Sequence, residues 1–97
     1  MTAYVLTLEA REDLRHIGEY GREEFGLEQA LRFQDEMEET FNLLAEQPGM
    51  GFVRPEYAPE SVRFFVRGPA VIAYRWERRP IEVLRVITGS LDLLERG

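Results

Sequence analysis

The stretch that decides the fold runs from residue 10 to residue 49 and reads AREDLRHIGEYGREEFGLEQALRFQDEMEETFNLLAEQPG. Apolar or small residues recur in it every three or four positions, with charged residues on the other faces. The first stripe comprises Leu14, Ile17, Gly21 and Phe25. The second comprises Ala30, Phe33, Met37, Phe41 and Leu44. Because Gly26 stands between them, where a left-handed residue commonly closes a helix, the pattern predicts a helical hairpin.

The segments on either side of the hairpin predict a strand and a loop. Tyr4, Leu6 and Leu8 alternate with the residues between them, which predicts a short first strand, and the helix is expected to start at Glu9 or a neighbour. Residues 47–60 contain three prolines and the pair Gly49 and Gly51, which predict a loop. Its length exceeds the usual connection and hints at a role.

The second half of the chain predicts an antiparallel meander. Strand-like runs cover residues 61–67, 70–77 and 81–87, separated only by Gly68-Pro69 and by residues 78–80. Residues 91–96 predict one C-terminal helical turn. The expected fold is therefore α+β in the order β-α-α-β-β-β, a single domain over residues 1–97. Its helical hairpin packs on a small, mainly antiparallel four-stranded sheet.

Two faces of the middle strand compete to be the core. Ile72, Tyr74 and Trp76 share one face, and Val71 and Ala73 share the other with an arginine. Either face could pack against the helices. We expect the face with Ile72 and Tyr74 to do so.

Composition limits the classes of function. The chain has 97 residues, a net charge of −6 and no cysteine, which excludes disulfides, thiolate metal sites and thiol redox chemistry. Residues 1–50 hold twelve acids against four arginines, and residues 51–97 hold six against eight. The overall balance argues against tight, direct nucleic-acid binding. Neither a membrane span nor a signal peptide is evident, so a cytoplasmic protein is expected.

The titratable clusters outside the sheet favour plain explanations. His16, the one histidine, lies four residues after Glu12, and the two could form an acid-base pair or half of a metal site, but a solvated surface histidine is simpler. The acids Asp35, Glu36, Glu38 and Glu39 could bind a cation, but they are expected to form a solvated helix face. We therefore expect no metal, no cofactor and no catalytic residue.

Arginines concentrate in the predicted strands and are the strongest local chemical feature. They comprise Arg63, Arg67, Arg75 and Arg85, with Arg78 and Arg79 at a turn. Exposed strand faces are often rich in arginine for solubility alone. A binding function and solubility therefore explain these arginines about equally well. If these arginines form a binding site, an acidic protein segment is the favoured partner, since guanidinium pairs well with carboxylate.

The ordered residues along the chain resemble one known family. They run Ala10, Asp13, Leu14, Ile17 and Tyr20, then Phe25-Gly26, Ala30, Phe33, Leu44, Pro48 and Gly51, then Tyr74-Arg75 and Arg85-Val86. Together they resemble the ParE/RelE toxin superfamily, which implies a toxin of a type II toxin-antitoxin system with the element order predicted above.

The resemblance distinguishes two branches. Members of the RelE type are ribosome-dependent ribonucleases with a basic sheet and a late tyrosine. In this chain Phe65 stands at a basic strand position of that pattern, Val71 at the arginine of the following strand and Leu91 at the arginine after the sheet. No tyrosine follows Tyr74. The resemblance therefore implies the ParE branch, whose members inhibit DNA gyrase. It further implies a ParD-like antitoxin that forms a hetero-oligomer and lies beside the hairpin and the sheet.

Three functions stay open at this point. The leading hypothesis is an antitoxin-bound gyrase inhibitor, with partner contacts expected at Leu14, Ile17, Arg63, Arg75 and Arg85. The second is a ribonuclease that uses Arg63, Arg75 and Arg85. The third is an inactive remnant that only binds the antitoxin.

Overall fold

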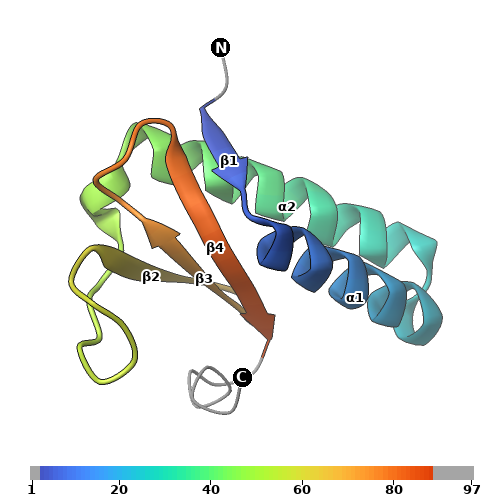
Figure 1. The fold of residues 1–97 in the computed structure, drawn as a ribbon. Helices are drawn as coiled ribbons and strands as arrows, with labels where there is room; N and C mark the ends of the chain where they lie inside the picture. Colours follow the sequence, from blue (N-terminus) through green and yellow to red (C-terminus); the bar gives the residue numbers. More distant parts are fainter. Residues whose placement is uncertain (1–2, 89–97) are drawn as a thin grey trace.

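A pair of helices and a four-stranded sheet form two layers in the computed structural model, which describes residues 3–88 (Figure 1). In chain order the elements are β1 (Tyr4–Leu6), α1 (Leu8–Phe25), α2 (Leu27–Glu46), the 3₁₀ turn η1 (Pro48–Met50), β2 (Val62–Arg67), β3 (Ala70–Arg75) and β4 (Ile81–Thr88). The predicted α+β class and element order are confirmed. The predicted turn at residues 91–96 lies outside the described residues.

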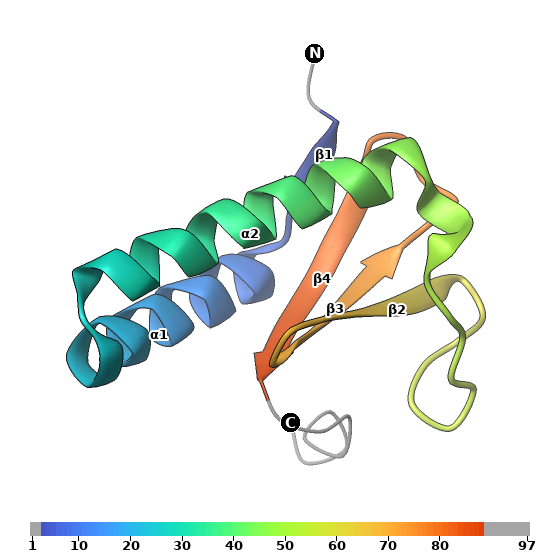
Figure 2. The same ribbon diagram turned by 180° about the vertical axis from the view of Figure 1, so that it is seen from behind.

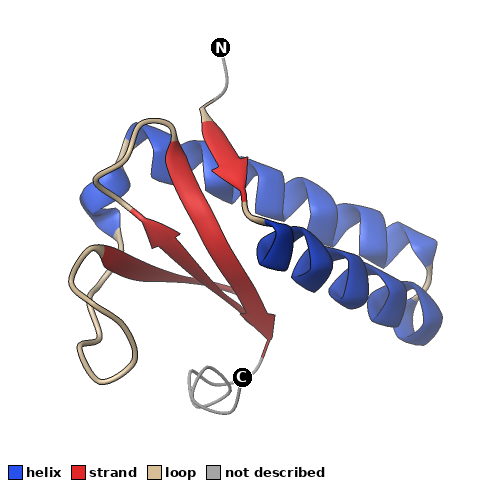
Figure 3. Cartoon of the chain, viewed as in Figure 1, coloured by secondary structure: helices blue, strands red, loops and turns tan. Residues whose placement is uncertain are grey.

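The sheet has the strand order β1-β4-β3-β2. The last three strands form the predicted antiparallel meander, and β1 adds to β4 in parallel at one edge. Colouring by secondary structure separates the helical layer from the sheet (Figure 3). The hairpin therefore packs on a mainly antiparallel sheet, as predicted.

Two caps set the limits of α1. The Thr7 Oγ1 atom accepts a hydrogen bond from the Ala10 backbone N–H at 3.1 Å, and this N-cap starts the helix at Leu8. Placing Leu8 in the first strand was therefore wrong, because the cap ends the strand at Leu6. At the other end Gly26 has φ of 94°, a conformation that glycine adopts without steric cost, and the turn to α2 occurs there as predicted.

Other boundaries move by one or two residues. β2 starts at Val62, β3 ends at Arg75 and β4 continues to Thr88. Residues 47–60 contain η1 and otherwise lack regular helix or strand, with a single bridge from Phe52 to Phe64. The loop prediction is therefore confirmed in outline.

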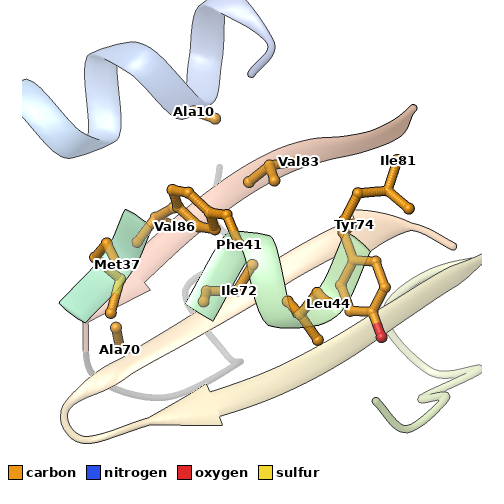
Figure 4. Close-up of a cluster of buried hydrophobic side chains, with 10 residues drawn as sticks. All are labelled: Ala10, Met37, Phe41, Leu44, Ala70, Ile72, Tyr74, Ile81, Val83 and Val86. Carbon is orange, nitrogen blue, oxygen red and sulfur yellow. The ribbon is translucent and has the colours of Figure 1, made fainter. Parts of the chain in front are cut away.

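The main core lies between the helices and the expected face of β3 (Figure 4). Ile72 and Tyr74 are fully buried there against Met37, Phe41 and Leu44 of α2. The preference for the face with Ile72 and Tyr74 is thus confirmed. Half-buried side chains of α1 and of the chain after β3 border the same cluster, among them Leu14, Ile17 and Trp76.

The opposite face of β3 is buried as well. Val71 and Ala73 pack with Phe64 in a second cluster. Residues of the long loop cover it, including Phe52, Tyr57 and Ala58. The loop therefore acts as a third layer, which explains why β3 is apolar on both faces up to Tyr74.

Hydrogen bonds tie this loop to the main core. The Tyr74 hydroxyl donates to the Pro48 carbonyl at 2.6 Å and accepts from the Gly51 N–H at 3.0 Å. Arg63 Nη1 donates to the Gly51 carbonyl at 2.7 Å. Burial raises the pKa of Tyr74, so the hydroxyl stays protonated and keeps its donor role.

Helix α1 is attached to the edge of β4 along the part of that strand that β1 does not pair with. β1 pairs with β4 only as far as Val83, and Thr7 then donates from its N–H to the Val83 carbonyl and from Oγ1 to the Leu84 carbonyl. Further along, Asp13 Oδ2 accepts from the Val86 N–H at 2.9 Å. The same carboxylate binds Arg85 through Nε at 2.7 Å and Nη2 at 3.1 Å. This two-pronged pair raises the pKa of Arg85.

Replacing Gly51 with alanine should destabilise the fold, because the new Cβ would stand 2.6 Å from the Tyr74 hydroxyl oxygen and 2.7 Å from the Phe64 carbonyl oxygen. We expect a loss of about 1 to 3 kcal/mol in the free energy of unfolding, measured by urea denaturation. Gly49→Ala is the matched control, since nothing lies within 4 Å of its Cβ. Equal stability of the two variants would contradict this account of the loop.

Replacing Asp13 with alanine should cost about 2 to 3 kcal/mol, because three hydrogen bonds are lost and the Val86 N–H and the Arg85 guanidinium lose their acceptor. The control Glu12→Ala removes only exposed ion pairs and should change stability by less than about 1 kcal/mol. Thermal unfolding followed by circular dichroism measures both. An Asp13 variant as stable as the control would show that this carboxylate does not anchor α1.

Candidate functional site

The tip of the helical hairpin is the most apolar exposed part of the described chain. α1 and α2 both extend past the sheet, so no strand lies beneath the turn that joins them (Figures 1 and 2). The large apolar side chains that are at least half exposed there are Tyr20, Phe25, Leu27 and Leu31. Tyr20 and Phe25 stack edge to face at 6.5 Å between ring centroids. This exposed apolar cluster makes the hairpin tip a candidate interaction surface.

One groove, here called the β1 groove, runs between the helices beside β1 and has a volume of about 530 Å³. Leu14, Phe33, Met37 and Phe41 line it, with Tyr4 and Leu6 of β1. Leu27 and Leu31 also line it and are exposed. Its α1 wall carries Arg11, Arg15, Gly18, Glu19 and Arg22.

A second groove, here called the Thr88 groove, separates the hairpin from the end of the sheet and has a volume of about 620 Å³. Its sheet side consists of Pro69 and Thr88. Its helical side includes Ile17, Tyr20, Gly21, Phe25 and Phe33. Because Gly18, Ala30 and Phe33 line both grooves, the two grooves lie on either side of the same helical contact.

The two predicted apolar contact residues belong to different grooves. Leu14 lines the β1 groove, and Ile17 lines the Thr88 groove. Each is only partly buried and packs against the main core with part of its surface. Both thus combine a structural role with an accessible apolar surface.

The three predicted arginines each have a partner inside the fold. The Arg63 guanidinium stacks on the Trp76 ring at 4.3 Å and bonds the Gly51 carbonyl, while its Nε is buried with no hydrogen-bond partner among the described residues. Arg75 Nε lies 3.0 Å from Glu82 Oε1, and the two side chains are 46% and 25% exposed. Arg85 binds Asp13.

These arginines do not form one site. In the register of β2 and β3, Arg63 stands opposite Tyr74 on the face covered by the helices. Arg75 follows Tyr74 directly, so it belongs to the other face. Arg85 reaches α1 at the edge of β4. A catalytic centre that uses all three would need a different arrangement.

The remaining titratable groups lie at the surface. His16 has a side chain 67% exposed, with Nε2 3.7 Å from Glu12 Oε2 and 3.0 Å from Arg15 Nη2. Asp35, Glu38 and Glu39 are exposed, and Glu36 is partly buried. The predictions of a surface histidine and of a largely solvated acidic face are therefore confirmed. Within residues 3–88 no group of three or more histidine or acidic side chains could hold a metal ion.

Sequence reasoning missed the groove walls. Arg11, Arg22, Leu27 and Leu31 were not predicted as site residues. Leu31 is out of phase with the second apolar stripe, and an apolar residue out of phase with a core stripe indicates a second, exposed surface. That signal was available in the sequence, as was the spacing that places Arg11 and Arg22 on one face of α1, whereas the groove beside them required the hairpin geometry.

Comparisons with known proteins agree with the resemblance seen in the sequence. A family model described as the ParE toxin of the type II toxin-antitoxin system parDE matches residues 4–93. Toxin ParE1 of Caulobacter vibrioides is 34% identical over 93 residues, which cover 95% of this chain and 94% of that protein.

A solved structure has the same fold. A chain from the chromosomal ParDE TA system of P. aeruginosa superposes with a TM-score of 0.74 and 26% sequence identity, covering 93% of this chain and 98% of that one. Within the described residues, neither α1 nor α2 is apolar enough to cross a membrane.

Replacing Gly18 or Gly21 with alanine should stabilise the fold by about 0.5 to 1 kcal/mol each, because both lie inside α1 and nothing stands within 4 Å of the added Cβ. Thermal unfolding measures the change. Gly26→Ala is the contrasting variant, since its site is equally open but its φ of 94° makes alanine unfavourable. Destabilisation by all three substitutions would mean that the grooves are tighter than described.

Proposed function

The chain belongs to the family of ParE toxins of type II toxin-antitoxin systems, and from this premise we propose that a ParD-like antitoxin neutralises it and that the free toxin inhibits DNA gyrase. In this proposal the toxin works by binding and has no catalytic residues of its own. Both events would take place in the cytoplasm.

One observation carries the proposal of antitoxin binding. The hairpin tip exposes Tyr20, Phe25, Leu27 and Leu31 and has an apolar groove on each side. Grooves of this kind accept the apolar face of an amphipathic helix. A segment of the antitoxin that becomes ordered in them would bury this surface and leave the toxin inactive.

The predicted contact residues take different parts in this proposal. Leu14 and Ile17 would touch the antitoxin from the floors of the two grooves. Arg75 would offer an exposed guanidinium to an acidic residue of the partner. Arg63 and Arg85 would act mainly by holding the loop at Gly51 and the helix α1 in place.

The arrangement of the arginines supports a gyrase inhibitor over a ribonuclease. Phosphodiester cleavage needs a proton-transferring group and donors that converge on one phosphate. Arg63 and Arg75 belong to opposite faces of the sheet, and Arg85 is paired with Asp13. The ribonuclease alternative therefore has no convergent set of these three arginines to use.

Expression of the toxin alone from a tightly controlled promoter tests the action of the free protein. We expect growth arrest, filamentous cells, induction of the DNA-damage response and intact transcripts, with purified toxin inhibiting gyrase supercoiling. Cleavage of ribosome-bound transcripts would contradict the gyrase proposal and support the ribonuclease alternative. Normal growth with folded protein present would leave only an antitoxin-binding remnant.

Replacing Leu31 with aspartate should weaken antitoxin binding about tenfold or more, because a charge would enter an apolar contact, while the exposed position leaves the fold intact. Isothermal titration calorimetry with the co-encoded antitoxin measures the dissociation constant. Val66→Asp is the matched control, since Val66 is 52% exposed against 50% for Leu31 but lines neither groove. Equal binding by both variants would count against the hairpin as the antitoxin site.

A further inference from the structure

The Thr88 groove lies where the described part of the chain ends. Thr88 is the last residue of β4 and lines this groove, so residues 89–97, here called the tail, begin beside it. The groove has apolar walls and three titratable side chains at its border. The apolar residues include Ile17, Tyr20, Phe25 and Phe33, and the titratable ones are His16, Arg32 and Glu36. Because Tyr20 and Phe25 are 61% and 68% exposed, much of the apolar wall faces solvent within the described structure.

The sequence of the tail has the pattern that such a groove requires. It reads GSLDLLERG, with three leucines and three charged residues after the pair Gly89-Ser90. On a helical turn over residues 91–96, at about 100° per residue, the leucines fall within an arc of about 160°. The charged side chains fall within an arc of about 100° on the other side. An amphipathic turn of this length is unstable in isolation, so it needs an apolar surface to pack against.

We propose that the tail folds back as an amphipathic turn and packs its leucines into the Thr88 groove. Along α1 the groove extends from Ile17 to Phe25, a distance of about 12 Å on a helix. A helical turn over residues 91–96 spans about 9 Å, and Gly89-Ser90 supplies a short flexible link to β4. The tail therefore has the length to cover the exposed rings of the groove. This inference concerns the free toxin and goes beyond the function proposed above.

Charge at the border of the groove also fits the tail. Arg32 is 61% exposed, and its ion pair within the described residues is with Glu28, which is 91% exposed and lies 3.8 Å away. Such a surface pair contributes little to stability, so the Arg32 guanidinium is available to another carboxylate. Asp92 and Glu95 are three residues apart and share the charged side of the predicted turn, so the tail brings carboxylates to this border.

The tail is a better occupant of the groove than a second copy of the toxin. Each copy has a net charge of −6, so two copies repel each other. A short link to the same chain, by contrast, keeps the tail at an effective concentration in the millimolar range. Packing within one molecule therefore outcompetes association of two molecules at micromolar protein concentration.

A spin label on the tail tests the inference in the 97-residue chain. Because the sequence has no cysteine, Arg96→Cys provides a single attachment site on the charged side of the turn. We expect the active label to remove most of the amide NMR signal intensity of Gly21 and Gln29, which line the Thr88 groove, relative to the reduced label. Gly49, in η1 at the far end of α2, should keep its signal. Unchanged intensities at Gly21 and Gln29 would overturn the inference.

Matched variants of the labelled chain distinguish docking from chance encounters. Tyr20→Asp places a charge in the Thr88 groove and should restore the lost signals. Leu31→Asp is the control, because Leu31 is 50% exposed but lines the β1 groove and not the Thr88 groove, and it should leave the signal loss unchanged. Replacing Leu91 and Leu94 together with aspartate should also restore the signals without altering residues 3–88. Signal loss that survives both the groove variant and the tail variant would overturn the inference.

A mixed sample separates the tail of the same chain from the tail of another. Toxin that carries the spin label is mixed with isotope-enriched toxin that carries none. Full signal intensity at Gly21 and Gln29 in this mixture supports docking within one molecule. Signal loss in the mixture equal to that in the singly labelled sample would assign the groove to a second copy and overturn the inference. Antitoxin binding and gyrase inhibition are measured separately, so failure here leaves the proposed function intact.

Discussion

The attachment of α1 to the free edge of β4 is the interaction on which the rest of the structure depends. β1 has three residues and β4 has eight, so much of the edge of β4 has no strand beside it. Thr7 and Asp13 supply the missing partners from the start of the helix, and Asp13 adds the pair with Arg85. Because these contacts lie in the first half of α1, they fix the direction of the hairpin and leave its tip beyond the sheet.

This placement connects the fold to its proposed use. The sheet covers the part of the hairpin whose side chains enter the main core, which includes Ala10, Leu14 and Ile17 of α1 and Met37, Phe41 and Leu44 of α2. The part near Gly26 keeps its apolar residues in contact with solvent, and a groove opens on each side of it. The chain therefore folds around one half of its hairpin, and the exposed other half is the surface that the proposed function assigns to the antitoxin.

Regular patterns in the sequence predicted the elements well. The stripes around Leu14 and Phe33 predicted both helices, Gly26 predicted the turn, and the short connection at Gly68 predicted the meander. Two features depended on contacts between distant residues and could not be read from local patterns. The loop that covers Val71 and Ala73 is one, and the pairing of Asp13 with Arg85, 72 residues apart, is the other. A strand arginine that looked free for binding was therefore part of the fold.

Hydrogen–deuterium exchange of the toxin with and without its antitoxin would test most directly whether the hairpin tip is the partner surface. The account predicts that antitoxin binding slows exchange in the helical turns around Gly18 and Leu31, which border the grooves. Exchange in β2 should change little. Slowed exchange confined to the sheet, with the hairpin tip unchanged, would contradict the account.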